Sequence, residues 1–238
     1  MTDHPGALPC DYDARPDRFR QGRDLIRRAG GGDGVHRQVA DRFHSEGLRC
    51  VLDLGCGDGT LLRLLSRSRL TVRTVGLDRA WALLRDAPAP VVRGDAAALP
   101  FHDAAFDGAA ALFMLYHLPD PTLALREAHR VLRAGGLFAA AAPSRDDSPE
   151  LACFLPPAAP VSFDAEVAAD LLGGVFEEVE VQRWNLPLRL PDRPTVRDYL
   201  VGMFLASGGL AERVAARVEA PLVVTKRGAL CFARKAGP

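Results

Sequence analysis

The residues best suited to chemistry lie close together in residues 49–59, which read Arg-Cys-Val-Leu-Asp-Leu-Gly-Cys-Gly-Asp-Gly. A short apolar run there ends at Asp53, and three glycines come after it at alternate positions: Gly55, Gly57 and Gly59. Because glycine has no Cβ, a turn made of glycines lets a ligand lie directly against the backbone. The pattern predicts a buried strand over 50–54, a sharp turn, and a helix over 60–68 with leucines at helical spacing.

The charges beside this turn favour a cationic ligand over a dinucleotide. Dinucleotide-binding turns read G-x-G-x-x-G, whereas the third glycine comes one residue earlier here. Asp53 precedes the turn and Asp58 lies within it, and two carboxylates would repel a pyrophosphate. They suit a ligand that presents an ammonium and a sulfonium. A tight strand-helix connection that binds nothing is the alternative for the turn taken alone.

Further acids lie at the ends of later predicted strands. A strand over 71–77 ends on Asp78, and a strand over 90–93 is followed by Asp95. A fourth strand over 106–115 is small and apolar, as in a parallel sheet covered on both faces. An acid after the second strand can accept the two hydroxyls of a ribose. Each acid alone is more often a turn residue or helix cap, but their coincidence at strand ends favours a nucleoside ligand.

With these motifs the chain resembles the class I S-adenosylmethionine-dependent methyltransferases, most closely the small-molecule branch related to the ubiquinone/menaquinone methyltransferases. The matching segments are VLDLGCGDGT at 51–60, VGLDRA at 75–80, VVRGDAAALPF at 91–101, FDGAAALFMLYHLPDP at 106–121 and LREAHRVLRAGG at 125–136. The resemblance covers about residues 45 to 143 and is specific for the cofactor rather than for the methyl acceptor. It implies an α/β fold: a Rossmann-like, seven-stranded, mostly parallel sheet with helices on both faces and a helical cap.

The resemblance also implies which residues hold the cofactor. Asp53 and Gly55 would hold the methionine ammonium, and Asp78 would accept the ribose hydroxyls. Asp95 and the residue after it would meet the adenine. Leu112 departs from the polar residue often found at its place, although its carbonyl could still accept a hydrogen bond from the ammonium. The complete expected set is Asp53, Gly55, Cys56, Gly57, Asp78, Arg79, Asp95, Ala96 and Leu112.

Methyl transfer from a sulfonium asks the protein for alignment and exclusion of water, and for a base when the acceptor must lose a proton. His117 is the best candidate base, because it lies just after the fourth strand and a histidine pKa lies near neutrality. A histidine that caps the Pro119-Asp120 turn is the alternative. Tyr116 is the second catalytic candidate, as a base or as a wall of the site. No metal site is expected, since the sequence has neither H-x-x-x-H nor a tight carboxylate-histidine cluster.

The segments outside the matched region predict a lid and a cap. The expected domains are an N-terminal helical lid over 1–47, a cofactor-binding core over 48–184, a helical cap insertion over 185–221 and the final strand of the core over 222–238. In the lid, Tyr12 or Arg15 would touch the carboxylate of the cofactor or would only anchor the lid. In the cap, Tyr199, Met203 and Phe204 form an apolar stripe at helical spacing, which is more typical of core than of a substrate site.

The composition fits a single enzyme domain, with 238 residues of which 48% are hydrophobic. Thirty basic and thirty acidic residues cancel, and the arginines of residues 15–28 are interleaved with aspartates, unlike an unbalanced nucleic-acid-binding face. No apolar run approaches the ~20 residues of a membrane span, and the first residues lack the apolar core of a signal peptide. The five cysteines are scattered, as in a reduced cytosolic protein. We therefore expect a cytoplasmic protein that binds neither nucleic acid nor membrane.

The segment after the fourth strand narrows the nature of the acceptor. Enzymes of this fold that methylate exocyclic amines of bases or glutamine amides usually carry an Asn/Asp-Pro-Pro-aromatic segment there, whereas this chain has Met-Leu-Tyr-His-Leu-Pro. RNA cytosine-C5 methyltransferases need a nucleophilic cysteine near that place, and the segment has none. We therefore predict methylation of a small organic metabolite on O, N or C, in a biosynthetic pathway such as one of secondary metabolism, by a monomer or homodimer. Two alternatives stay open. They are methylation of a peptide or protein group such as a carboxylate, and cofactor binding without transfer activity.

Overall fold

The computed structural model describes residues 12–13, 16–67, 71–88, 90–157, 160–203 and 207–237. The chain forms two compact units. The first, here called the sheet unit, comprises Asp33–Ser144, Val161–Trp184 and Gly228–Pro238. The second, the helical unit, comprises Met1–Gly32, Arg145–Pro160 and Asn185–Arg227. This division differs from the expected lid over 1–47, because residues 33–47 belong to the sheet unit.

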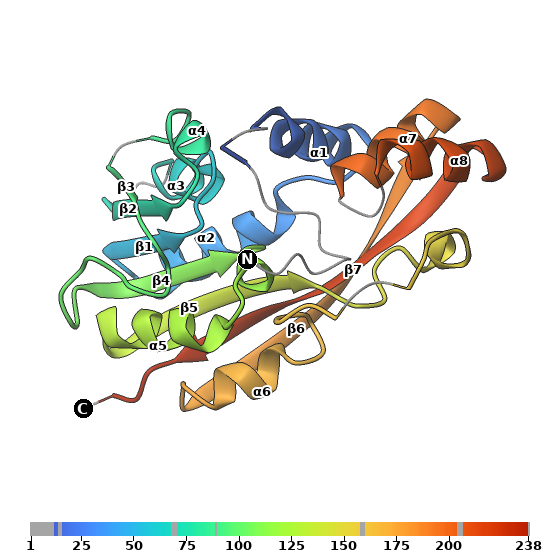
Figure 1. The fold of residues 1–238 in the computed structure, drawn as a ribbon. Coiled ribbons are helices and arrows are strands. Elements are labelled where there is room, and N and C mark those ends of the chain that lie inside the picture. Colours follow the sequence, from blue (N-terminus) through green and yellow to red (C-terminus); the bar gives the residue numbers. More distant parts are fainter. Residues whose placement is uncertain are drawn as a thin grey trace. The chain divides into compact units, whose positions relative to one another are not determined.

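The described strands form one seven-stranded sheet in the order β3-β2-β1-β4-β5-β7-β6. The strands are β1 (Cys50–Leu54), β2 (Arg73–Asp78), β3 (Val91–Arg93), β4 (Phe106–Leu112), β5 (Leu132–Pro143), β6 (Glu178–Leu190) and β7 (Leu222–Arg234). Neighbours from β3 to β5 pair in parallel, and β7 is antiparallel to β5 (Figure 1). This arrangement confirms the predicted mostly parallel, seven-stranded fold.

The helices of each unit come from separate parts of the chain. In the sheet unit they are α2 (Gly34–Ser45), α3 (Thr60–Leu65), α4 (Trp81–Leu84), η1 (a 3₁₀ turn, Leu115–His117), α5 (Pro121–Val131) and α6 (Ala168–Gly173). In the helical unit they are α1 (Pro16–Arg28), η2 (Pro149–Phe154), α7 (Arg193–Gly202) and α8 (Gly208–Arg217). Helix α5 begins at Pro121, because the Asp120 side chain accepts from the Thr122 N–H and proline is compatible with the first turn.

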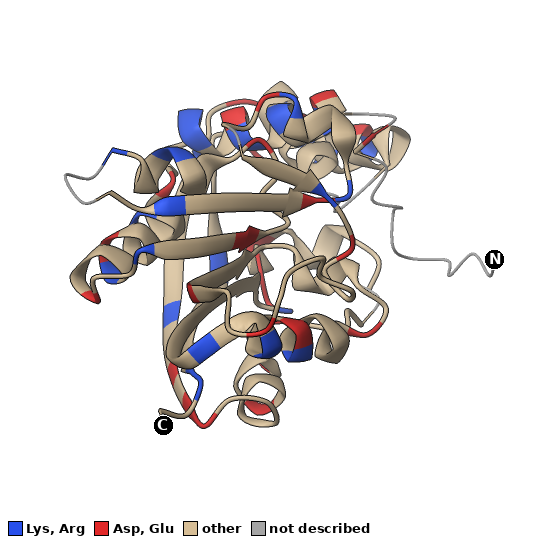
Figure 2. Ribbon diagram, turned by 90° about the vertical axis from the view of Figure 1, so that its left-hand side faces the viewer, with Lys and Arg blue, Asp and Glu red and all other residues tan. Residues whose placement is uncertain are grey.

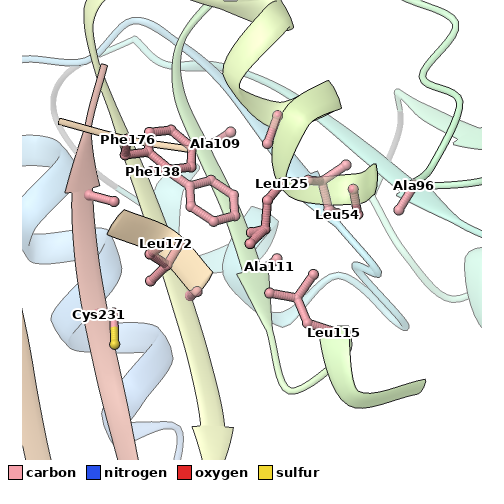
Figure 3. Packing of buried hydrophobic residues seen from close by; sticks show 14 of the residues in the cluster. Leu54, Ala96, Ala109, Ala111, Leu115, Leu125, Phe138, Leu172, Phe176 and Cys231 are labelled. Atoms are coloured by element: carbon pink, nitrogen blue, oxygen red, sulfur yellow. The ribbon is translucent and has the colours of Figure 1, made fainter. Parts of the chain in front are cut away.

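Alternate residues of the central strands enter two different cores, one on each face of the sheet. Leu52 and Leu54 of β1 are buried with residues of α5 and α6, whereas Val51 is buried with residues of α2 and α3. On the α5 face, Phe138 of β5 stacks on Phe176 with ring centroids 5.2 Å apart, as Figure 3 shows. Because successive residues of a strand point to opposite faces, a doubly covered strand must be apolar throughout, as β4 is.

The helical unit has a core of its own. Tyr199 of α7 is fully buried there, and its hydroxyl lies 2.6 Å from the Ser148 Oγ. Helices α1 and α7 approach closely at Gly22 and Gly202, where a Cβ on Gly22 would lie 2.9 Å from the Gly202 carbonyl oxygen. The predicted stripe thus contributes core residues. Phe204, the last of that stripe, and Arg15 of the expected lid lie outside the described residues.

Charged side chains of both signs are mixed along the elements of each unit (Figure 2). Several form ion pairs within a unit, such as Arg42 with Glu46 on α2 and Arg130 with Glu127 on α5. Within the part of the chain that the structure describes, no helix has the length and apolar character needed to cross a lipid bilayer.

One sequence expectation about a strand end differs from the structure. The fourth strand ends at Leu112 rather than at residue 115, because Phe113 has a positive φ of 59° and the chain then turns into η1.

The final strand, β7, continues through Arg227-Gly228. Gly228 provides room there, since a Cβ would overlap the indole of Trp184 and lie 2.5 Å from the Ala142 carbonyl oxygen.

We predict that Gly228→Ala lowers the free energy of unfolding by about 1–3 kcal/mol, the range for overpacking a filled core. Chemical denaturation followed by circular dichroism measures the change. Gly173→Ala is the matched control, because nothing lies within 4 Å of a Cβ at that position. Equal stability of the Gly228 variant and the wild type would contradict the packing of Trp184 on β7.

Candidate functional site

The turn after β1 has the backbone conformation that its three glycines suggest. Gly55, Gly57 and Gly59 have φ angles of 64°, 54° and 82°, in the left-handed region that side chains with a Cβ rarely adopt. Space is restricted as well, since a Cβ on Gly55 would lie 2.7 Å from the Met114 Cβ. Gly59 is the N-terminal cap of α3. The turn therefore requires glycine for its conformation at each position and for close packing at Gly55.

Asp53 is the most unusual charged residue of the site. It lies on β1 opposite Gly76 and Ala110 of the neighbouring strands, and only 3% of its surface is exposed. No described residue donates a hydrogen bond to its carboxylate or pairs with it. Burial, followed by the negative charges of Asp78 and Asp58, raises the pKa of Asp53 well above its ordinary value. A cation beside this carboxylate would offset that unfavourable environment.

Asp78 supports the turn from the end of β2. Its two carboxylate oxygens accept hydrogen bonds of 2.8 Å from the backbone N–H groups of Gly57 and Ala80. The Cys56 N–H donates to the Leu77 carbonyl at 3.1 Å, so the turn is held to β2 by two bonds. Each carboxylate oxygen can accept more than one hydrogen bond, and this bonding is therefore compatible with additional hydroxyl donors.

Cys56 has a structural role in this arrangement. Its side chain is buried against Leu62 and Leu84, and a Cβ on Gly76 would lie 2.7 Å from its Sγ. Burial, more than the nearby carboxylates, raises the pKa of the thiol well above its usual range. The thiol is therefore neutral and packed, and only the backbone of Cys56 can contact a ligand that lies on the turn.

The other expected cofactor residues lie at or just beyond the ends of β2, β3 and β4. Asp95 is exposed, and its Oδ1 accepts from the Ala97 N–H at 2.9 Å. Ala96 is buried in the core on the α5 face, so its methyl group is directed into that core. Arg79 has an exposed side chain, and its carbonyl accepts from the Arg93 Nε. The sheet thus brings the expected residues to the ends of neighbouring strands, although Ala96 and Leu112 offer a ligand only their backbone.

The two catalytic candidates lie in η1, directly after β4. The rings of Tyr116 and His117 have centroids 4.4 Å apart, and Tyr116 packs against the core on the α5 face. Surrounding protein atoms lower the pKa of His117 to about 4, because they disfavour the protonated ring. His117 nevertheless keeps an exposed surface, which limits this effect. His117 is therefore neutral at pH 7, in the protonation state of a base.

Three residues near the site have no counterpart in the sequence prediction. Met114 closes the space over Gly55, and the Phe113 ring lies 6.3 Å from the Trp184 ring. The glycines predict a close approach to the backbone of the turn, but no sequence signal indicates that Met114 makes it at Gly55. No sequence signal indicates the positive φ of Phe113, because phenylalanine rarely adopts it.

We predict that Asp53→Asn becomes more stable relative to the wild type as the pH rises. Because folding raises the pKa of Asp53, the folded state keeps a proton that the unfolded chain releases near pH 3.8, and stability falls as the pH increases through the raised value. The relative gain between about pH 4 and pH 8 should reach about 1.4 kcal/mol or more, since one pKa unit corresponds to that energy. Denaturant unfolding of the ligand-free proteins measures it.

The control for this measurement is Asp103→Asn, whose carboxylate is 79% exposed. It removes an exposed carboxylate instead of a buried one, so the comparison isolates the effect of burial. A constant difference between Asp53→Asn and the wild type over this pH range would contradict the buried state of the Asp53 carboxylate.

Comparison with known proteins places these motifs in a family. The methyltransferase domain family matches residues 52–140, which include the glycine turn, β2, β3, β4 and part of β5. The 27-O-demethylrifamycin SV methyltransferase of Amycolatopsis mediterranei is 32% identical over 151 residues, covering 58% of this chain and 52% of that protein. The demethylmenaquinone methyltransferase of Lactiplantibacillus plantarum is 33% identical over 132 residues, covering 49% and 56%. The chain thus spans about half the length of these relatives.

Solved structures share the fold. The YcgJ protein of Bacillus subtilis superimposes with a TM-score of 0.67 over 87% of this chain and 100% of its own, at 16% identity. At that identity the likeness concerns the fold alone. The match over residues 52–140, which include the glycine turn after β1, identifies this part of the sheet unit as a methyltransferase domain.

Proposed function

We propose that this chain transfers the methyl group of S-adenosylmethionine to a small organic molecule. The observation that carries the proposal is the Asp53 carboxylate, which is 3% exposed and has no hydrogen-bond donor among the described residues. An isolated buried carboxylate is unfavourable, and a ligand cation removes the penalty. The ammonium of the cofactor is such a cation. In this proposal the ammonium lies beside the backbone of the turn that follows Asp53.

The residues of the site fit this cofactor. When bound, it supplies a methyl group already activated by a positively charged sulfur. Asp53 would hold the ammonium with the backbone of Gly55, and Asp78 would accept the ribose hydroxyls while holding the turn. Asp95 and the backbone of Ala96 would contact the adenine. In this proposal the protein contributes binding, orientation and exclusion of water, which can supply several kcal/mol of rate acceleration.

The names of two similar proteins support a small organic molecule as the methyl acceptor. Two curated proteins that resemble this chain are named for a demethylated rifamycin and for demethylmenaquinone, which are both organic metabolites. We propose an acceptor of this class, methylated on O, N or C in a biosynthetic pathway of the cytoplasm, such as one of secondary metabolism. The lowered pKa of His117 keeps its ring neutral at pH 7, and a neutral ring can accept the proton of a hydroxyl or amine. Tyr116 would form a wall beside it.

We predict that the wild type binds S-adenosylhomocysteine, the demethylated cofactor, and that Asp53→Ala weakens this binding at least tenfold. Loss of a partner for a charged group costs about 1.5–3 kcal/mol, and about 1.4 kcal/mol corresponds to tenfold. Titration calorimetry measures both proteins. Asp103→Ala is the control, because its carboxylate is exposed and pairs with Arg130 away from the glycine turn. Unaltered affinity of the Asp53 variant would remove this residue from the site.

Transfer itself is tested with S-adenosylmethionine labelled in its methyl group. We expect label in phenols, catechols or amines of low mass and none in peptides offered at the same concentration. Labelled peptides would favour the alternative of a peptide or protein acceptor. Binding of the cofactor with no label in any acceptor of a broad panel would favour the alternative without transfer activity.

We predict that His117→Ala lowers kcat by about 10²–10⁴ with an acceptor that must lose a proton, the range for a general base. In the wild type, kcat/KM should fall on the acid side with a midpoint below 6.5, because the environment lowers the pKa of His117. The base is lost as the pH falls through that pKa, so the variant should lack this limb of the profile. Unchanged turnover of the variant would leave His117 without a catalytic role.

A further inference from the structure

Trp184 packs against the backbone of β7 at a glycine. Its indole lies directly on Gly228 of β7, where a Cβ would overlap the ring. The Phe113 ring contacts it edge to face, with centroids 6.3 Å apart and an angle of 72° between the planes. The ring of His36, on α2, lies 6.1 Å from the Phe113 ring. Trp184 and Phe113 are called the aromatic pair below.

The aromatic pair combines two locally unfavourable features. The Trp184 Nε1 is shielded from solvent and has no hydrogen-bond acceptor among the described residues, whereas buried donors are nearly always paired. Phe113 has a φ of 59°, which is strained for a residue with a large side chain. Strain and unsatisfied groups persist when the surrounding structure imposes them, and they cluster at ligand-binding sites. Their meeting at one contact is therefore evidence for a ligand there.

The aromatic pair lies on the same face of the sheet as the Asp53 side chain. Phe113 comes directly after β4, and its N–H donates to the Ala141 carbonyl at 2.8 Å. Both members pack against the core on the α2 face, which also contains Ala110. Asp53 pairs with Ala110 across parallel strands, so its side chain points to the same face of the sheet. The pair therefore lies on the face that carries Asp53, at the end of the strand next to β1.

We propose that the aromatic pair binds the methyl acceptor and that the Trp184 N–H donates a hydrogen bond to an oxygen of it. This inference rests on the proposed function and specifies its substrate class, a planar aromatic or conjugated molecule with a phenolic or carbonyl oxygen. Rings that meet edge to face present apolar surface to a planar ligand. The indole N–H is a donor only, so its partner must be an acceptor.

The carboxylate of the cofactor is another oxygen that could reach the Trp184 N–H. An aromatic surrounding favours the neutral oxygen of a planar ring over a carboxylate, because removing a charge from water is far less favourable. The two sources of the oxygen predict different outcomes. If the Trp184 N–H donates to the methyl acceptor, removing the N–H leaves the affinity for the cofactor unchanged. If it donates to the carboxylate of the cofactor, removing the N–H weakens cofactor binding.

The test uses 2-naphthol and naphthalene, which share a shape and differ in one oxygen. We expect the wild type saturated with S-adenosylhomocysteine to bind 2-naphthol about tenfold more tightly than naphthalene, as for one hydrogen bond to a buried donor. Trp184→Phe keeps an aromatic ring without the N–H, and it should bind both probes equally and bind S-adenosylhomocysteine as the wild type does. Trp81→Phe is the matched control, since the other tryptophan is 52% exposed, and it should keep the preference.

Trp184→Phe alters the size of the ring, and a second variant separates this effect. In Trp81→Phe, the remaining indole can be exchanged for benzothiophene by feeding the amino acid analogue, which keeps the shape and removes only the N–H. This protein should lose the roughly tenfold preference for 2-naphthol, whether or not Trp184→Phe folds.

The outcomes that overturn the inference are distinct from failure of the proposed function. Absence of a preference for 2-naphthol in the wild type, or its retention without the N–H, overturns the inference while cofactor binding stands. Weaker binding of S-adenosylhomocysteine to Trp184→Phe than to the wild type would assign the N–H to the cofactor and would also overturn the inference. A wild type that does not bind S-adenosylhomocysteine refutes the proposed function, and the inference with it.

Discussion

One buried charge constrains the site at the ends of the strands, since the Asp53 carboxylate is 3% exposed and accepts no hydrogen bond from a described residue. Asp53 lies on β1, which pairs with β2 on one side and β4 on the other. The free energy of its charge therefore depends on the groups at the end of β1. The glycine turn follows Asp53, and it is held to β2 because the N–H groups of Cys56 and Gly57 donate to Leu77 and Asp78. Asp53 and Asp78 thus have different roles. Asp78 stabilises the turn, and Asp53 remains in an environment that a positively charged ligand improves.

Residues 50–59 could be interpreted from the sequence because each feature there has one physical reason. An apolar run bounded by an acid predicts the buried strand, and alternate glycines predict a turn with positive φ. The same logic holds for the apolar runs and terminal acids of β2, β3 and β4. The bonding of Asp78 could not be predicted, since a carboxylate at a strand end can accept from backbone N–H groups as well as from a ligand.

Other features depend on contacts between distant residues, which the sequence pattern does not contain. The run through residues 106–115 is almost uniformly apolar, so nothing marks the change at Phe113 from strand to a positive φ. Gly228 lies within β7, and only the structure shows that it accommodates the indole of Trp184. Ala96 comes after an acid at the expected place and nevertheless buries its methyl group in the core. In each case packing against another element decides the local structure, as it often does for short segments.

We propose that Asp53 holds a positive charge of the cofactor, and the pKa of Asp53 itself tests this role most directly. Carbon-detected NMR of protein labelled at the aspartate carboxyl carbons follows that titration, with Asp53→Asn to assign the signal. We expect a pKa of Asp53 well above 3.8 in the free protein and a lower pKa when S-adenosylmethionine is added. An ordinary pKa in the free protein, or a raised pKa that the cofactor leaves unchanged, would contradict it.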